Sequence, residues 1–421
     1  MSVLKHVTIE GLWDERRVET DFDPKVNFLI GSNGSGKTTL LNLVASALSS
    51  DYDGLSRGHF STIECDLVSP KSNAQTKVVV GRANKELIRP AFQYTIQGPG
   101  KKELKFEIVS PSPRYLMGSP IRLQGRVSTK VYDAETSPLT EYVRVKWLTV
   151  HRAPTKARGE DRPTSDSSVD RHLGTLSNQL VRYFSKLAAQ REEETNRFLR
   201  EMLASLIYNA SEFNPFTHAQ GLDLATMQSS VEALLDTFLR PAAAKKARER
   251  LKAHFQLAAE AQGNKEQFKL EELIALATVF PMQKIVEEWG NTQKKQAALA
   301  RPRTEFLEII NEMYHNKQLL LNQENVLEVE LPSGKHLTLL ELSSGEKQLL
   351  ILFAEALLQE REEFIYMADE PELSLHVTWQ EQLTRNLLKA NPNAQVIFAT
   401  HSPDIVSQYG KNTIDMETLI A

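Results

Sequence analysis

Residues 26–48, with the sequence VNFLIGSNGSGKTTLLNLVASAL, constrain the fold of this chain more than any other stretch. Residues 26–30 form a short apolar run that is typical of a buried parallel strand. Residues 31–38 then match the pattern G-x-x-x-x-G-K-[ST] at every defined position. The residues that follow place Leu40, Leu41, Val44 and Leu48 on one face of a predicted helix. A strand, a glycine-rich loop and a helix in this order predict an α/β fold with a phosphate-binding loop.

The residue types of this loop suit a bound nucleotide. Glycines let the backbone approach an anion closely, and the free N–H groups at the start of the helix supply positive potential. We expect Lys37 to reach the β and γ phosphates of ATP and the Thr38 hydroxyl to ligate Mg²⁺. An accidental glycine-rich turn is disfavoured by the flanking strand and helix. The predicted nucleotide-binding residues of the loop are Asn33, Gly34, Ser35, Gly36, Lys37, Thr38 and Thr39.

Composition excludes several classes of protein. The formal net charge is −4, so any contact with DNA would need a local basic patch. Cys65 is the single cysteine, which excludes an internal disulfide, disfavours a cysteine-based zinc site and fits a reducing cytosol. The first residues lack a secretory apolar region, and the longest apolar run, 349–358, is too short to span a bilayer. We therefore expect a cytoplasmic protein without a membrane segment.

The chain changes character twice, which predicts three regions. Residues 1–152 contain the phosphate loop and then short alternating runs between 60 and 150 that predict an antiparallel β subdomain. Residues 153–320 begin with a polar segment and continue with helix formers. Residues 321–421 return to strands and helices, beginning with a hairpin that turns at 332–335. Both ends would then form one nucleotide-binding fold, with a parallel core sheet, that is interrupted by a helical insertion.

The architecture of the insertion stays open between two alternatives. Apolar residues recur at three- and four-residue steps, which fits either a small helical bundle or a short antiparallel coiled-coil hairpin. Pro241 and Pro281 disfavour one long uninterrupted rod. Residues 245–255, KKARERLKAHF, offer a local basic face, although such a run is usually a solvated helix surface.

Two apolar strands in the last region end in side chains suited to phosphate chemistry. Asp369 and Glu370 follow the strand at 364–368. A carboxylate in the first position suits Mg²⁺, and one in the second suits activation of a water molecule. His401 follows the strand at 395–400 and would reach the γ-phosphate and that water, although a lone histidine is more often structural.

Ser343, Ser344 and Gly345 stand at the start of a further predicted helix. Ser343 is an N-cap, and Glu346 three positions later completes a capping box, which is a purely structural interpretation. The functional interpretation is that this helix terminus, with its free N–H groups and hydroxyls, binds a second phosphate face.

The order of GSNGSGKT, LSSGEKQ, MADEPELSLH and ATHSPD resembles the ABC-type ATPases, and within them the SMC/RecF-like branch. In that family two nucleotide-binding domains enclose two ATP molecules, and the signature serine and glycine of one chain complete the site of the other. The resemblance implies that the chain hydrolyses ATP with Mg²⁺ and is at least a dimer. By position, the implied signature is Ser343, Ser344 and Gly345, the metal ligands are Thr38 and Asp369, and the catalytic residues are Glu370 and His401.

The same resemblance assigns two further segments. Residues 372–376 match the loop that contacts the opposite subunit. No clear glutamine loop is present, and Arg152 stands in the place of a phosphate-sensing arginine of related proteins, with Gln124 as the alternative. For the adenine base, Trp13 or Arg16 are stacking candidates, and either is equally well explained as a surface or core residue.

The long helical insertion between the phosphate loop and the signature resembles SMC/RecF-like ATPases more than transporter ATPases. Related OLD-family ATPases carry a TOPRIM nuclease after the histidine strand, and we expect none in this protein. It resembles the stand-alone ATPase subunits of anti-phage systems such as PARIS and Septu. The resemblance implies control of a separately encoded nuclease or toxin effector, with a phage protein as the trigger. The alternatives are a DNA-repair ATPase that clamps DNA on dimerisation, and a scaffold for which hydrolysis is only a reset.

Overall fold

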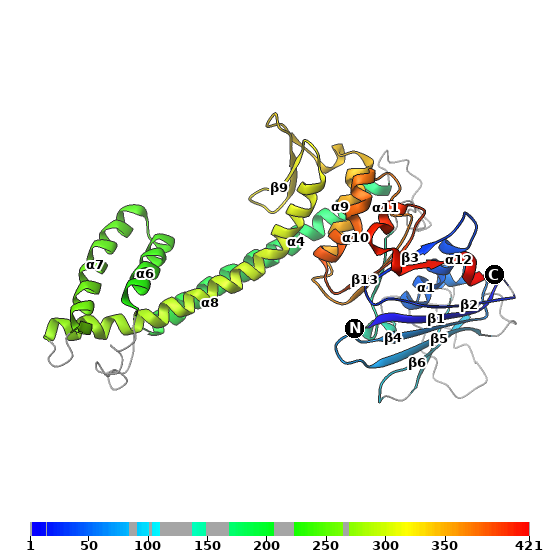
Figure 1. The fold of residues 1–421 in the computed structure, drawn as a ribbon, viewed down its shortest axis with the longest axis horizontal. Coiled ribbons are helices and arrows are strands. Elements are labelled where there is room, and N and C mark those ends of the chain that lie inside the picture. The colour runs from blue at the N-terminus through cyan, green and yellow to red at the C-terminus, as the bar shows by residue number, and fades with distance from the viewer. Residues whose placement is uncertain are drawn as a thin grey trace, which may run out of the picture. The chain divides into compact units, whose positions relative to one another are not determined.

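The structure is a computed structural model that describes residues 2–13, 15–83, 91–100, 103–109, 137–148, 168–205, 223–263 and 269–420. It divides into two compact units, residues 1–181 together with 305–421, and residues 182–304. We name the first the sheet unit and the second the helical unit, and describe each by itself (Figure 1). The predicted limit near residue 153 lies outside the described residues and stays a prediction. The predicted limit near residue 320 lies among the described residues and also stays a prediction.

The sheet unit is built on a parallel sheet of five strands in the order β14-β3-β13-β12-β8. Their bounds are β3 Val26–Ile30, β8 Val145–Leu148, β12 Phe364–Asp369, β13 Ala394–Ala399 and β14 Thr413–Asp415. Asp369 lies beside Ala399, and Ala399 lies beside Leu29. Because parallel strands end at a common edge, the segments that follow β3, β12 and β13 meet there.

A second sheet is antiparallel and has six strands in the order β2-β1-β4-β5-β6-β7. The strands are β1 Val3–Leu12, β2 Arg16–Asp21, β4 Thr62–Val68, β5 Gln75–Ala83, β6 Ala91–Gln97 and β7 Leu104–Ile108. Alternate residues of β4 and β5 are buried, as the alternating pattern predicts. One of the short runs predicted between residues 60 and 150, at 128–133, lies outside the described residues.

One strand prediction was wrong. The run at 142–150 was expected in the antiparallel sheet, but β8 pairs parallel with β12 at the edge of the other sheet. The Ile365 N–H donates to the Arg144 carbonyl at 3.0 Å and starts this pairing. Alternation along a short run identifies a strand but not its partner, and the partner here lies more than two hundred residues away in sequence.

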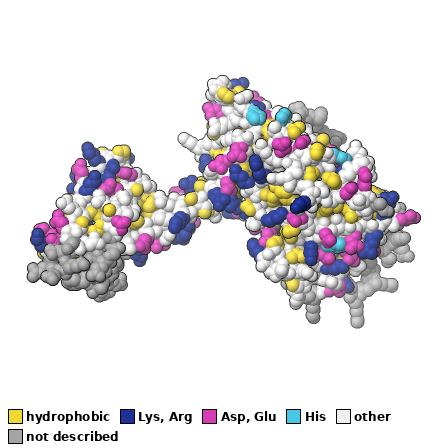
Figure 2. Space-filling model, viewed as in Figure 1, with side chains coloured by type: hydrophobic (Ala, Val, Ile, Leu, Met, Phe, Trp, Pro, Cys, Tyr) yellow, Lys and Arg dark blue, Asp and Glu magenta, His cyan; other side chains and the backbone are white. Residues whose placement is uncertain are grey.

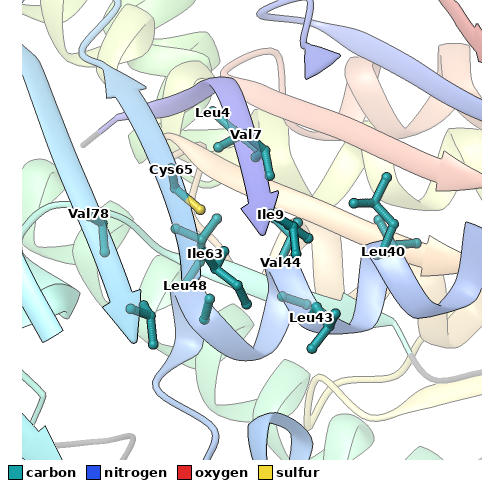
Figure 3. Packing of buried hydrophobic residues seen from close by; sticks show 14 of the residues in the cluster. Leu4, Val7, Ile9, Leu40, Leu43, Val44, Leu48, Ile63, Cys65 and Val78 are labelled. Carbon is teal, nitrogen blue, oxygen red and sulfur yellow. The ribbon is translucent and has the colours of Figure 1, made fainter. Parts of the chain in front are cut away.

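The helix after the phosphate loop, α1 (Lys37–Ser49), packs between the two sheets and fills the main core. Its apolar face contacts strands of both sheets, and Cys65 is buried among them. Figure 3 shows this packing, with labels on Leu4, Val7, Ile9, Leu40, Leu43, Val44, Leu48, Ile63, Cys65 and Val78. Burial of each such leucine contributes about 1.5–3 kcal/mol.

The opposite face of the parallel sheet is covered by α9 (Ser344–Leu357). Ile365 and Met367 belong to the core beside α1, whereas Tyr366 between them donates its hydroxyl to the carbonyls of Glu355 (3.4 Å) and Ala356 (3.2 Å) in α9. Helix α10 (Val377–Ala390) packs beside α9. Successive residues of β12 thus face two layers, which explains its continuous apolar run.

Smaller elements complete the sheet unit. The predicted hairpin is present as β10 (Leu327–Glu330) and β11 (His336–Leu337), and β9 (Gln318–Leu321) adds a third strand that was not predicted. The remaining elements are α2 Tyr52–Arg57, η1 Pro138–Glu141, η3 Leu339–Glu341, α11 Pro403–Val406, η4 Ser407–Asn412 and α12 Met416–Ile420.

Long helices form the helical unit and run back into the sheet unit: α4 (Ser168–Ser205) and α8 (Leu270–Met313). Within the helical unit they lie antiparallel, because Thr195 accepts from Gln296 (Oγ1···Nε2 2.7 Å) while Phe198 contacts Trp289. Helices α6 (Leu224–Phe238) and α7 (Pro241–Gly263) pack with the first turns of α8 around a small core. The insertion therefore combines both alternatives, a long helical hairpin and a helical cluster (Figure 1).

The expected interruption at Pro281 was wrong, since α8 continues through both Pro281 and Pro302. An internal proline costs about 3 kcal/mol in an isolated helix. Val279, fully buried in the small core, shows that tertiary packing holds this part of α8 in place. Pro241 is the first residue of α7, where its missing N–H is harmless. Among the described residues, no helix is long and apolar enough to cross a membrane.

Candidate nucleotide-binding site

The phosphate loop joins β3 to α1 at the carboxyl edge of the parallel sheet. Gly34 and Gly36 have φ angles of 86° and 89°, a left-handed conformation that other residues rarely adopt. The Ser35 N–H donates to the Ser32 carbonyl at 3.2 Å and closes the turn. The backbone itself therefore favours glycine at the defined position 36 and at the undefined position 34 of the pattern.

Lys37 folds back over this loop and is 5% exposed. Its Nζ donates to the carbonyls of Gly31 (2.9 Å) and Ser32 (3.0 Å). Burial lowers the pKa of Lys37, and the nearby carboxylates of Glu370 and Asp369 oppose that shift. The buried Ser35 Oγ has no hydrogen-bond partner among the described residues. The buried Lys37 ammonium is held by carbonyl oxygens, and the Ser35 hydroxyl is free to donate a hydrogen bond. Both features fit a bound polyphosphate.

Thr38 and Asp369 bring two distant motifs into contact. The Thr38 Oγ1, in the first turn of α1, donates to Asp369 Oδ1, at the end of β12, at 3.0 Å. A hydroxyl and a carboxylate oxygen side by side next to a phosphate loop match the way proteins hold Mg²⁺, with the remaining ligands coming from phosphates and water. The residues present therefore fit Mg²⁺ bound with a nucleotide.

Glu370 has a strained backbone. Its φ is 49°, in the left-handed region, and its N–H donates to the Ala399 carbonyl at 2.8 Å. Its Oε1 lies 3.9 Å from the His401 Nε2, and both side chains are about one-third exposed. Strained residues persist where the surrounding structure fixes them, often at functional sites. The arrangement places a carboxylate and an imidazole side by side at the solvent-facing edge of the site.

The signature segment is tied to its own helix. The Ser343 N–H and Oγ both donate to Glu346 Oε2, at 2.8 and 2.7 Å, and Lys317 Nζ donates to the same oxygen at 2.8 Å. The predicted capping box is therefore confirmed. A Cβ on Gly345 would lie 2.5 Å from the Ser374 carbonyl oxygen. Within the part of the chain that the structure describes, no hydrogen bond joins residues 343–345 to the phosphate loop.

A protein-family model described as "AAA domain, putative AbiEii toxin, Type IV TA system" matches residues 26–407. The chain belongs to this family. The match begins at β3 and ends after His401, so it includes the phosphate loop, the signature, Asp369 and Glu370. Together with the two sheets and the inserted helices, this membership confirms the expected α/β fold of an ABC-type ATPase.

This AAA-domain protein also resembles individual known proteins. It is 28% identical over 99 residues to the DNA replication and repair protein RecF of Lactobacillus acidophilus, and the match covers 24% of each chain. The Smc head domain of Pyrococcus furiosus, solved with the C-terminal domain of ScpA, is 13% identical with a TM-score of 0.37, covering 97% of this chain and 92% of that one. The Smc head domain of Pyrococcus yayanosii is 13% identical with a TM-score of 0.38, covering 97% and 93%.

Part of the predicted site comes together within one chain of this AAA-domain protein. The loop residues 33–39, Asp369, Glu370 and His401 follow three neighbouring strands. Arg152 and Gln124 lie outside the described residues, so both stay predictions. Trp13 is 40% exposed at a turn, and the Arg16 guanidinium lies 6.0 Å from its ring centroid.

Sequence reasoning missed Glu417 at this edge and named Glu372 only as the first residue of the loop expected to contact the opposite subunit. Glu417, in α12, accepts the Ser32 N–H at 3.1 Å, and hydrogen bonds from Ser32 lower the pKa of Glu417. No signal in the sequence pointed to this residue. Glu372 is bonded to the segment that follows β13. Its signal was present, because it stands two positions after Glu370 in the same motif.

Proposed function

We propose that the protein is a Mg²⁺-dependent ATPase that converts ATP and water to ADP and phosphate and works as an assembly of at least two copies. The contact between Thr38 Oγ1 and Asp369 Oδ1 carries this proposal, because it joins the phosphate loop to the acidic motif at a magnesium-binding geometry. Membership in the AAA-domain family supports it.

Each residue has a role in this proposal. Residues 33–39 and the Lys37 ammonium bind the phosphates, and Thr38 and Asp369 would hold Mg²⁺, which neutralises charge on the β and γ phosphates. The Glu370 carboxylate orients the attacking water and accepts its proton. His401 Nε2 donates to the γ-phosphate and stabilises its developing charge.

A second copy would complete the site. In the proposed assembly Ser343, Ser344 and Gly345 of one copy close over the nucleotide of another. Leu340 precedes this segment, Leu373 lies in the loop at 372–376 and Val377 follows it, and they are 56%, 41% and 50% exposed. These apolar side chains are available for contact with a second copy.

The test uses two variants. Glu370→Gln is expected to bind ATP and Mg²⁺ but to hydrolyse ATP at least about 10²-fold more slowly than wild type. A closed assembly should therefore accumulate and sediment as a dimer or larger species. Lys37→Ala is the control that should neither bind ATP nor assemble. If Glu370→Gln hydrolyses ATP at the wild-type rate, Glu370 is not the general base.

We further propose that the ATPase controls a separately encoded nuclease or toxin effector in anti-phage defence, with a phage protein as trigger. The toxin–antitoxin wording of its family supports a link to toxic effectors. The experiment is to purify tagged Glu370→Gln from the native host with ATP and Mg²⁺, and to identify the captured proteins by mass spectrometry. A nuclease or toxin encoded nearby, captured without DNA, is the expected result.

A DNA-clamping repair ATPase is the second candidate. The similarity to RecF favours this candidate. So do the exposed basic side chains of α7, which are Lys245, Lys246, Arg250 and Lys252. Acidic side chains are interspersed with basic ones over the helical unit, which weakens the case (Figure 2). Capture of DNA or a repair factor, with no effector, would establish this candidate and overturn the defence role. Wild-type protein that binds ATP and assembles without turnover would instead indicate a scaffold.

A further inference from the structure

Glu372 links the two loops that carry the proposed catalytic pair. We propose that Glu372 is a positioning residue that holds the His401 imidazole beside Glu370. This inference deepens the proposed ATPase function and rests on it. Glu372 follows β12 in the motif Asp369-Glu370-Pro371-Glu372, whereas His401 follows β13.

A single oxygen of Glu372 makes the link. Its Oε1 accepts hydrogen bonds from Thr400 Oγ1 at 2.6 Å, from the His401 N–H at 2.9 Å and from the Ser402 N–H at 3.3 Å. The Ser402 N–H also donates to Thr400 Oγ1 at 2.9 Å. The backbone of the histidine segment is therefore fixed by one acceptor oxygen.

The two oxygens of Glu372 lie in different environments. Glu372 is 9% exposed, and its Oε2 is buried without a hydrogen-bond partner among the described residues. A buried polar atom left unpaired costs about 1–3 kcal/mol. The cost is explained if the carboxylate is retained for the three donors on its other oxygen.

The hydrogen bonds make the two loops one rigid group. The Glu370 N–H is held by the Ala399 carbonyl, one residue before Thr400, and Glu372 holds the next three residues. This arrangement sets the 3.9 Å separation of Glu370 Oε1 and His401 Nε2. Without the Glu372 carboxylate, the His401 N–H and the Thr400 hydroxyl lose their acceptor, the Ser402 N–H keeps only Thr400 Oγ1, and the His401 segment is no longer fixed.

The first test needs neither nucleotide nor turnover. Amide hydrogen exchange of residues 401 and 402 is measured in the full chain for wild type, Glu372→Ala, Glu372→Gln and Glu363→Ala. Glu363 is a matched control, because it is 6% exposed, pairs with Lys71 at 3.3 Å and precedes the amino end of the same strand. We expect Glu372→Ala to accelerate exchange about tenfold or more, Glu372→Gln to restore most of the protection, and Glu363→Ala to leave it unchanged.

The second test measures coupling to His401. Glu372→Ala is expected to lower kcat about 10²-fold with KM for ATP within about twofold of wild type, because a small misplacement of a catalytic group has that effect. In a His401→Ala background the same substitution should lower kcat by less than about twofold, since there is no imidazole left to position.

Two outcomes would overturn the inference. One is exchange at residues 401 and 402 that does not change in Glu372→Ala. The other is an equal loss of kcat with and without the His401 side chain, which would show that Glu372 acts independently. A wild-type protein without ATPase activity would refute the proposed function, and the exchange measurement would still decide whether Glu372 holds the His401 segment.

Discussion

Polar groups at the two ends of β12 and β13 differ in whether their hydrogen-bonding needs are met and whether their backbone is strained. Near the amino ends, the fully buried Gln395 side chain donates to the Leu4 carbonyl at 2.7 Å and accepts the Leu4 N–H at 2.8 Å, which ties the two sheets together. At the carboxyl ends, Glu370 has a strained backbone and Glu372 has a buried oxygen without a described partner. The same strands thus carry stability at one end and strained, reactive groups at the other.

The largest expected effect lies at the carboxyl edge. Lys37→Ala removes the ammonium that folds over the phosphate loop, so we expect ATP affinity to fall about 100-fold or more, with a small change in melting temperature. Calorimetric titration with a non-hydrolysable ATP analogue measures the affinity. Normal ATP binding by Lys37→Ala would contradict the proposed difference between the two ends of the strands, because the carboxyl edge of the sheet would then not be the nucleotide site.

The amino end should give the opposite result. Gln395→Leu leaves the N–H and carbonyl of Leu4 buried without partners, so the free energy of unfolding should fall by about 2–5 kcal/mol. The kcat per folded molecule should not change. Urea denaturation measures the first quantity, and Gln97→Leu, at an exposed glutamine of β6, is a control expected within about 0.5 kcal/mol of wild type. A lower kcat in Gln395→Leu would contradict the division between the two ends.

The buried carboxylate of Glu355 pairs with the partly exposed Lys146 and His172, and this cluster extends the comparison to pH dependence. Burial of Glu355 in α9 would raise its pKa, but a hydrogen bond from His172 and the charge of Lys146 outweigh it, so the pKa is lowered below the usual 4.5. A lowered carboxylate pKa adds stability above the unfolded-state pKa, and this stability is lost as pH falls through the folded-state pKa.

Glu355→Gln should therefore cost about 1–2 kcal/mol in unfolding free energy near neutral pH. The difference from wild type should shrink progressively once the pH falls below 4.5. Urea denaturation at several pH values measures it, and kcat should be unaffected. A difference that does not change with pH would mean that packing, not charge, is the contribution of Glu355.

The smallest effect is a gain in stability. Asparagine tolerates left-handed backbone better than glutamate, so Glu370→Asn should raise the free energy of unfolding by about 0.5 kcal/mol while ATP turnover is lost. Denaturant midpoints compared with Glu381→Asn, at a helical glutamate of α10, measure the gain. Loss of stability in Glu370→Asn would show that the strain is absent or is compensated by contacts of the glutamate side chain.

Sequence reasoning succeeded where chemistry depends on neighbouring residues. The phosphate loop, its strand and helix, and the acidic pair after β12 are each encoded in a few consecutive positions. The meeting of Thr38 with Asp369 followed because parallel strands end at a shared edge. The capping box at Ser343 was predictable for the same reason, since it needs residues only three apart.

It failed where distant parts of the chain decide the outcome. The partner of β8 is β12, far along the chain, and alternation within β8 carries no information about it. Pro281 reads as a helix breaker, yet the core around Val279 holds α8 together. Glu417 reaches Ser32 only because β14 pairs with β3 and places α12 beside the loop. Each of these depends on tertiary contacts that no short window of sequence contains.

The close approach of Gly345 to the Ser374 carbonyl limits how the signature can be probed. Any side chain at position 345 would push α9 away from the loop after β12 in the isolated chain, before a second copy or a nucleotide is present. Loss of activity in a Gly345 variant would therefore reflect a distorted structure within its own subunit. It would not show that Gly345 binds the phosphate held by another copy. Genetic screens that recover such variants would report on the shape of one subunit.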